Sequence, residues 1–194
     1  MSVTSPLAWT KRPLRFFQHL LRESDGAKSS IGQLIGEIRS VGANACIVMG
    51  GGFSAWYPTR LSSQTINPHL KGDFLGDFLK AAKAEDIRVL VRMDISKGRE
   101  GMEEKHPDWF VRRPNGAISS VWAMPQICAT GPFWQTEVFS ILDEILGRYP
   151  AADGFFFNYL HVPRCHCERC RGIVEEATGK PVPQPDRREP AYEA

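Results

Sequence analysis

The chain of 194 residues carries 24 basic and 22 acidic side chains, a formal net charge of +2, and is 42% hydrophobic. These values fit a globular protein of one domain, or two small ones, and argue against disorder over the whole length. It has no run of about 18 apolar residues, which excludes a membrane partner through a spanning helix. The balanced charge, without a long Lys/Arg block, excludes a dedicated nucleic-acid binder.

Two features predict a cytoplasmic protein. The N-terminus has no apolar segment of the kind that a secretory signal requires. The five cysteines are odd in number, and three of them crowd into residues 165–170. A secreted disulfide scaffold is shorter and has an even number of cysteines spread along the chain.

Hydrophobic periodicity and turn residues predict an alternation of strands and helices. Residues 13–21 form a short strand, or a helix, since Pro13 suits a first helical turn. Ser30 and Asp73 each precede an apolar stripe at helical spacing, which predicts two helices that begin there. Further strands are expected at 45–49, 87–94 and 155–159, and further helices at 132–149 and 171–177.

This alternation is typical of a parallel sheet with helices outside it. The run 45–49 is apolar without alternation, as in a strand buried on both faces, and its Cys46 is expected to be a core thiol. Functional residues are then expected on loops that follow the strands, and the longest loops, 50–72 and 95–131, lie there. Asp153 precedes the last strand and is expected to serve in turn and capping chemistry.

The cysteine cluster is the most specific chemical signal. Cys165, Cys167 and Cys170 place three thiols within six residues. Zn²⁺ prefers four ligands at tetrahedral angles. Cys128, in the loop before the helix that leads to the last strand, is the best candidate for the fourth, with His166 or His161 as substitutes. The alternative is a set of free cytosolic thiols.

Polar side chains gather at the ends of two predicted strands. Arg92, Asp94 and Lys97 follow one another at the end of 87–94. A carboxylate between two cations stays ionised and can bind sugar hydroxyls or orient another group; a structural ion pair is the alternative. Asn158 ends the last strand, and because a buried amide is costly unless hydrogen-bonded, we favour a role for it in a site.

The long loops carry four aromatic side chains that could contact a sugar. Flat rings with a polar edge suit sugar faces, although each ring is equally suited to plug the core, and we expect two of the four to do so. These residues are Trp56, Tyr57, Trp109 and Trp122. Gly50-Gly51-Gly52 precedes no helix and lacks the spacing of a phosphate-binding loop, so we interpret it as a glycine-rich strand exit.

Several short motifs occur in order along residues 12–192. They are Arg15-Phe16-Phe17, Arg22-Glu23, Gly42-Ala43-Asn44-Ala45, Gly51-Gly52-Phe53, Tyr57-Pro58-Thr59, Gly72-Asp73-Phe74, Arg92-Met93-Asp94-Ile95-Ser96-Lys97, His106-Pro107-Asp108-Trp109-Phe110, Cys128-Ala129-Thr130-Gly131-Pro132 and Asp153-Gly154-Phe155-Phe156-Phe157-Asn158. In these motifs the chain resembles the hypothetical glycosyl hydrolase 6 family. The resemblance implies a glycosidase-like TIM (β/α)8 barrel within an α/β fold, acting on O-glycosidic bonds.

A more distant likeness is to the family 42 β-galactosidases, in which one cysteine before the fourth strand and a C-x-C-x-x-C after it hold zinc. Cys128 and the three later cysteines match that arrangement. The resemblance implies a structural Zn²⁺. In those enzymes the fourth strand ends in Asn-Glu, and in α-fucosidase-like barrels it ends in a nucleophilic Asp. Here Asn158 is followed by Tyr159, so the expected carboxylate is missing.

Length sets a further expectation. A TIM barrel has eight βα units in about 250 residues, and four strands are expected up to Tyr159. We therefore expect a half-barrel or truncated barrel over 13–178, flanked by an N-terminal tail (1–12) and a Pro-rich charged tail (179–194). Its uncovered edges predict a homo-oligomer or a complementing C-terminal half. A glycosidase needs two carboxylates, so the chain alone is expected to be an incomplete catalyst.

Three hypotheses follow. The leading one is the N-terminal part of a glycoside hydrolase-like protein for galactoside- or fucoside-type carbohydrates, with Asp94 and Asn158 as catalytic candidates. Its substrate-binding candidates are Glu23, Arg92, Lys97, Trp56, Tyr57 and Trp109. The second is a non-catalytic carbohydrate-binding or regulatory module with a structural zinc. The third is a small metal-binding domain whose cysteine cluster is its purpose.

Overall fold

The computed structural model describes residues 8–160 and 162–184. Parts of the two expected tails (1–7 and 185–194) and His161 lie outside the described residues. The strands are β1 (Phe16–Gln18), β2 (Ala45–Gly52), β3 (Arg88–Asp94), β4 (Ser120–Val121), β5 (Met124–Pro125) and β6 (Gly154–Phe157). The helices are α1 (Ile31–Ser40), α2 (Phe74–Ala84), α3 (Met102–Lys105), α4 (Val138–Arg148) and α5 (Glu168–Thr178), with a π-helical turn at Phe133–Glu137 and 3-10 turns at Ala8–Lys11, Glu23–Ala27 and Pro107–Trp109.

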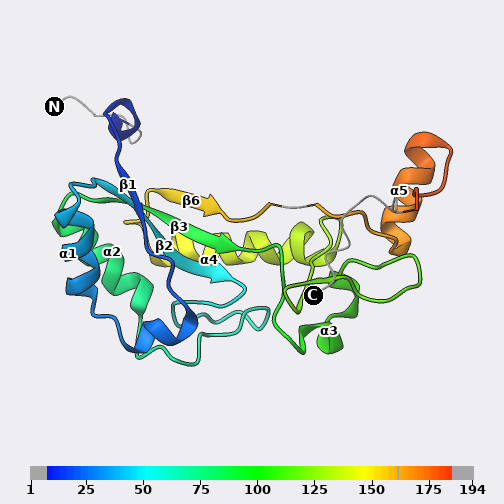
Figure 1. Ribbon diagram of the computed structural model, residues 1–194, viewed down its shortest axis with the longest axis horizontal. Helices are drawn as coiled ribbons and strands as arrows, with labels where there is room; N and C mark the ends of the chain where they lie inside the picture. Colours follow the sequence, from blue (N-terminus) through cyan, green and yellow to red (C-terminus); the bar gives the residue numbers. More distant parts are fainter. Residues whose placement is uncertain (1–7, 161, 185–194) are drawn as a thin grey trace.

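The main sheet is parallel and follows chain order, β1-β2-β3-β6. A helix lies between each pair of consecutive strands: α1, α2 and α4. Because right-handed crossovers in a sheet of sequential order put all helices on the same face, the other face of the sheet is left for a site. The predicted α/β fold with a parallel sheet is confirmed (Figure 1).

The predicted helix starts are confirmed by their caps. Ser30 Oγ accepts a hydrogen bond from the Gln33 N–H at 3.2 Å, and α1 follows. Asp73 Oδ1 accepts from the Gly76 N–H at 3.0 Å at the start of α2. Each side chain satisfies a backbone donor that the first helical turn leaves free.

The core lies between the sheet and its helices. Alternate side chains of β3 (Val89, Val91 and Met93) are buried on the helix side, beside α2 and α4. Cys46 is buried in the same core, and burial raises the pKa of its thiol to about 12. Among the described residues, no helix combines the length and apolar character that crossing a bilayer requires.

The glycines at 50–52 belong to β2 and do not form a strand exit. Their backbone pairs with β3 as far as the Gly52–Asp94 pair, with a bulge between Met49 and Gly51. Gly52 has φ +96°, and a Cβ there would lie 2.4 Å from the Asp94 carbonyl oxygen. Only glycine tolerates this approach, which lets the Phe53 N–H donate to the same oxygen at 2.7 Å.

Two further boundaries differ from the sequence-based expectation. The last strand ends at Phe157 and not at 159, because Tyr159 takes a left-handed conformation (φ +53°). The helix expected from Pro132 begins as a π-helical turn before α4. Asp153 has the expected turn role, since its carboxylate accepts from the Val89 N–H at 2.8 Å and pairs with Arg88.

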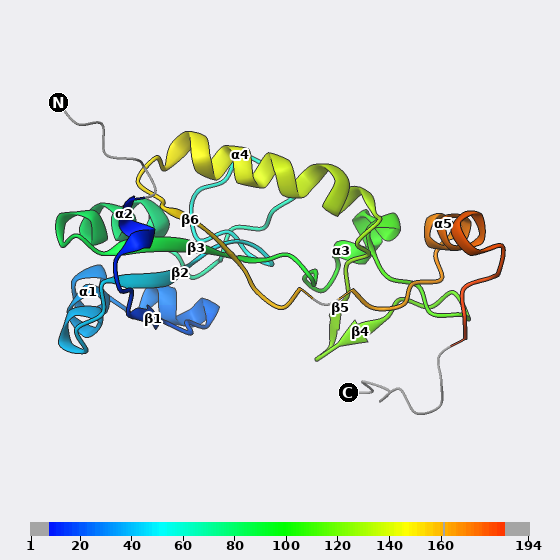
Figure 2. The ribbon, with the colours of Figure 1, turned by 90° about the horizontal axis from the view of Figure 1, so that it is seen from above.

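The segment after the sheet extends away from it. Figure 2 shows α3, the β4-β5 hairpin and α5 beyond the strand ends, with α5 farthest from α1 and α2. One edge of β6 has no strand partner among the described residues. Phe157 on β6 and Phe139 and Leu146 on the preceding helix α4 are exposed.

Candidate functional site

Asp94 is the last residue of β3 and shares a face with Arg92, because strand side chains two residues apart point the same way. This face is opposite the buried Val91 and Met93. Arg92 donates to both Asp94 carboxylate oxygens, from Nε at 2.9 Å and from Nη2 at 3.0 Å. The fork geometry fixes the carboxylate at the carboxyl end of the sheet.

Asn158 meets Asp94 through the register of two parallel strands. Arg92 pairs with Phe156 and Met93 with Phe157, which brings residue 158 next to Asp94. The Asn158 amide donates to Asp94 Oδ1 at 2.6 Å, and its backbone N–H donates to the Met93 carbonyl at 3.0 Å. The amide that sequence reasoning placed in a site therefore orients the carboxylate of the neighbouring strand.

Lys97 lies between two aromatic rings. Its Nζ is 4.5 Å from the centre of the Trp122 ring and 4.1 Å from that of Tyr159, and the two ring centres are 5.6 Å apart. Burial lowers the pKa of Lys97, and the Arg92 charge adds to this, while Asp94 opposes it. Trp122 remains 59% exposed. The result is a cationic and aromatic surface next to the fixed carboxylate.

The backbone around these rings is strained. Trp122 (φ +51°) and Ala123 (φ +58°) join β4 to β5, so this two-residue hairpin turn is of the type that Asn and Gly normally fill. Tyr159 also has positive φ. Non-glycine residues in this region cost energy and concentrate at functional sites. The Tyr159 ring was missed from the sequence, where the residue was noted only as replacing a carboxylate; its place directly after Asn158 was the available signal.

Glu23 forms a second ion pair at the site's periphery. Its carboxylate accepts a hydrogen bond from Arg99, which follows β3 in the chain, and both side chains are 26% exposed. The Arg99 guanidinium also lies 5.5 Å from the ring centre of Phe53, the residue after β2. Glu23 is thus held by a cation from the loop that follows Asp94.

Three aromatic candidates are buried. Trp56 is 1% exposed, Tyr57 0% and Trp109 5%, so their ring faces are covered by protein. Tyr57 donates to Glu144 at 2.9 Å, and burial raises the pKa of its hydroxyl. The Trp109 ring stacks on His106 with their centres 3.8 Å apart. Their burial favours the plug interpretation, and of the four loop aromatics only Trp122 presents a ring to solvent.

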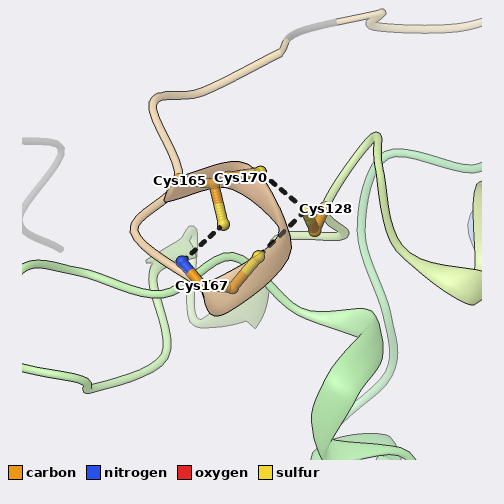
Figure 3. Close-up of side chains that lie close together, drawn as sticks. All are labelled: Cys128, Cys165, Cys167 and Cys170. Carbon is orange, nitrogen blue, oxygen red and sulfur yellow. Dashed lines mark hydrogen bonds between the residues drawn. The ribbon is translucent and has the colours of Figure 1, made fainter. Parts of the chain in front are cut away.

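The four predicted cysteines come together (Figure 3). Their sulfur atoms all lie within 4.8 Å of one another, with Cys128 Sγ 3.6 Å from Cys170 Sγ and 3.9 Å from Cys167 Sγ. Tetrahedral Zn–S bonds of 2.3 Å would place sulfur atoms about 3.8 Å apart. The cluster therefore fits a metal ion with four thiolate ligands, and His166 is not part of it.

Two backbone donors to Cys165 and the hydrogen bond between Cys165 and Cys128 support the same interpretation. The N–H groups of Arg112 and Cys167 each donate to Cys165 Sγ at 3.4 Å. The hydrogen bond from the Cys165 thiol lowers the pKa of Cys128 against the effect of burial, and the same contact together with burial raises the pKa of Cys165. Thiolates are the metal-binding form of cysteine, and such outer donors orient them.

Comparison with known proteins identifies the family. Residues 30–159 match the family described as hypothetical glycosyl hydrolase 6. The chain belongs to this family. No curated protein sequence matches the chain. The family assignment confirms the resemblance carried by the sequence motifs.

Solved structures extend the comparison to the fold. The chain is similar to α-L-fucosidase isoenzyme 2 from Paenibacillus thiaminolyticus (TM-score 0.69, 20% identity), covering 87% of this chain and 26% of the fucosidase. It is also similar to the cold-adapted β-galactosidase from Rahnella sp. R3 (TM-score 0.58, 18% identity), covering 76% and 21%. A hypothetical protein from Ruminiclostridium thermocellum ATCC 27405 aligns with TM-score 0.57 and 14% identity, covering 76% and 77%. This family member thus has a glycoside-hydrolase-type fold and spans about a quarter of the fucosidase.

Proposed function

We propose that the chain forms the sugar-binding part of a glycoside hydrolase-like barrel that acts on O-glycosidic bonds of galactoside- or fucoside-type carbohydrates. The observation that carries the proposal is the Asp94 cluster. A carboxylate fixed by Arg92 and Asn158 lies at the carboxyl end of the sheet, where parallel βα folds place their sites. The fucosidase and galactosidase folds to which the chain is similar support a carbohydrate ligand.

The residues of the cluster have complementary roles in this proposal. The Asp94 carboxylate accepts hydrogen bonds from sugar hydroxyls, and the Lys97 ammonium donates to ring substituents. The exposed face of Trp122 stacks on the apolar face of the sugar. The Glu23–Arg99 pair borders the ligand. Asn158 and Arg92 position the carboxylate and hold it ready for the ligand.

Catalysis requires more than this cluster provides. Glycoside hydrolysis uses two carboxyl groups on either side of the scissile bond, and position 158 holds an amide. We propose that the second carboxyl group comes from a complementing half or a second copy that pairs along the open edge of β6. The exposed Phe157 on β6, with Phe139 and Leu146 exposed on the preceding helix α4, supports an apolar contact there.

The experiment tests binding and turnover separately. Galactose and fucose are titrated into the purified chain by calorimetry, and a panel of nitrophenyl glycosides is assayed with the same sample. We expect saturable sugar binding without turnover, and about a tenfold weaker affinity in Asp94→Asn, which loses a charged acceptor. Asp143→Asn removes an exposed charge from α4 and serves as the control. Undiminished affinity in Asp94→Asn would exclude the cluster as the sugar site.

A second candidate is a non-catalytic carbohydrate-binding or regulatory module. It is favoured by one observation: both Asp94 oxygens are already bound by Arg92, and one also by Asn158, as in a structural ion pair. Native mass spectrometry separates the candidates. An oligomer, or a complex with a complementing half, that hydrolyses a glycoside supports the enzyme. An assembled species that binds sugar and never turns it over supports the module.

We also propose that the cysteine cluster holds a structural Zn²⁺. The four thiols come from the loop before α4 and from the start of α5, so one ion would join segments 37 residues apart in sequence, Cys128 and Cys165. When bound, zinc supplies a structural link, because four protein thiolates leave no open position for substrate. The zinc site would stabilise the loops beyond the sheet. It does not define the function of the protein by itself.

A further inference from the structure

A pocket lies away from the Asp94 cluster, between the loop 107–116 and the start of α5. Its cavity volume is about 700 Å³. Figure 2 shows α5 at the far end of the molecule from α1 and α2, beyond the strand ends. The lining includes none of the residues of the proposed sugar site, and it shares only Cys167 with the cysteine cluster. The pocket is therefore a separate feature.

The lining of this pocket is strongly basic. Four arginines line it, against two acidic residues, Asp108 and Glu168. The four are Arg112, Arg113, Arg169 and Arg171. The lining thus has two more cations than anions, within a chain whose formal net charge is only +2. The excess is local and not a property of the whole surface.

These guanidinium groups have no carboxylate partners in the part of the chain that the structure describes. Arg112 donates to the carbonyl oxygens of Gly116 at 3.2 Å and Pro107 at 2.6 Å, and Arg169 donates to that of Asp108 at 2.5 Å. No ion pair within 4.0 Å involves any of the four across residues 8–160 and 162–184. Carbonyl oxygens fix the guanidinium planes of Arg112 and Arg169 without neutralising their charge.

A histidine in the same lining has an unsatisfied atom. His166 Nε2 is buried and has no hydrogen-bond partner among the described residues. Its backbone N–H donates to the Arg112 carbonyl at 2.8 Å, which ties it to the arginine-bearing loop. A buried polar atom without a partner is costly, and this one belongs to a residue in the wall of the pocket.

We propose that this pocket binds a small molecule through a tetrahedral oxyanion, a phosphate or sulfate group, held by Arg112, Arg113, Arg169 and Arg171. Planar guanidinium forks match such oxygens and bind them with two parallel hydrogen bonds each. Several forks around one cavity favour a group with three or four oxygens over a carboxylate with two. The inference is independent of the proposed sugar-binding function, because it uses none of that site's residues.

The test is a calorimetric titration of the full chain with inorganic phosphate, sulfate and acetate, at constant ionic strength maintained with NaCl. The double variant R113Q/R171Q removes two charges from the pocket. Neither side chain makes a hydrogen bond or ion pair with the described residues, so the fold is expected to persist. The control R12Q/R60Q removes two exposed charges outside the lining.

We expect saturable binding of phosphate or sulfate, weakened about tenfold in R113Q/R171Q and unchanged in R12Q/R60Q. The anion that binds with the higher affinity identifies the natural ligand as a phosphorylated or as a sulfated molecule. Equal weakening in both double variants would assign the binding to net charge and overturn the proposal. Acetate affinity equal to that of both tetrahedral anions, or no saturable binding of either, would also overturn it.

Discussion

Glu144 provides a quantitative test of how the long loop after β2 is held. Its carboxylate, on α4, accepts hydrogen bonds from the Tyr57 hydroxyl at 2.9 Å, the Thr59 hydroxyl at 2.5 Å and the Arg60 N–H at 2.7 Å. The side chain is only 11% exposed. This one group therefore ties the loop that carries Trp56 and Tyr57 to the helix behind the sheet.

Replacing Glu144 by Gln removes the charge and one acceptor. A single amide oxygen can accept either from the two hydroxyls or from the Arg60 N–H. The amide nitrogen then lies at the other position, where the Arg60 N–H cannot accept and the two hydroxyls already accept from Gln64 or Leu61. The loss of at least one charge-assisted hydrogen bond, with weakening of the rest, predicts a cost of about 3 kcal/mol in the free energy of unfolding. Asp143→Asn, an exposed neighbour on the same helix, is expected to change it by less than about 0.5 kcal/mol.

The pH dependence of this effect has a definite sign. Burial raises the pKa of Glu144, but the hydrogen bonds from Thr59, Arg60 and Tyr57 outweigh it and leave the pKa below its ordinary value of 4.5. A depressed pKa in the folded state adds stability above the unfolded-state pKa, and this stability is lost as the pH falls through the folded-state pKa. The wild-type advantage over Glu144→Gln should thus be complete at pH 7 and shrink below about pH 4.5.

Urea unfolding at pH 7 and at steps down to pH 3.5 measures both effects, provided that the denaturant slopes of wild type and variant agree. A difference below about 0.5 kcal/mol at pH 7 would refute the reasoning that Glu144 holds the loop. A difference of the expected size that stays constant down to pH 3.5 would show that ionisation of Glu144 is not its source.

Three further predictions concern the last residue of β2, the hairpin turn and the cysteine cluster. Gly52→Ala forces a Cβ against the Asp94 carbonyl at positive φ and should cost roughly 2–4 kcal/mol in urea unfolding, whereas Gly116→Ala, at φ +83° in open space, should cost only about 1 kcal/mol. Ala123→Gly relieves the positive φ and should raise the free energy of unfolding by about 0.5–1 kcal/mol, while an unchanged value would argue against strain in the hairpin. Metal analysis should find one zinc per chain, which is lost in Cys170→Ser and retained in Cys46→Ser. A chelator should lower the Tm of the wild type. Equal zinc content in the two variants would contradict the four-cysteine site.

Local signals made the regular elements predictable. Ser30 and Asp73 cap α1 and α2 as expected, because a side-chain acceptor before an apolar stripe determines a helix start almost alone. The continuous apolar run at 45–49 marked a buried parallel strand. Its extension through the glycines to Gly52 depended on pairing with β3, a tertiary contact that local sequence does not encode.

The site was predictable where it follows from strand ends and not where it depends on loops. Asp94 and Asn158 both lie at the carboxyl ends of predicted strands, so their meeting follows from parallel register. The contact of Lys97 with Trp122 and Tyr159 joins residues up to 62 positions apart and requires an unusual hairpin turn. No periodicity or spacing reports which loop aromatics become buried, as Trp56 does.

The Asp94 cluster as a carbohydrate site is the central claim, and sugar titration of two matched aromatic variants tests it most directly. Trp122 and Phe139 are each 59% exposed, but only Trp122 lies beside Lys97. Calorimetric titration with fucose and galactose should show binding that Trp122→Ala weakens about tenfold and Phe139→Ala leaves unchanged. Binding that survives in Trp122→Ala, or is lost equally in both variants, would contradict a sugar site at Asp94.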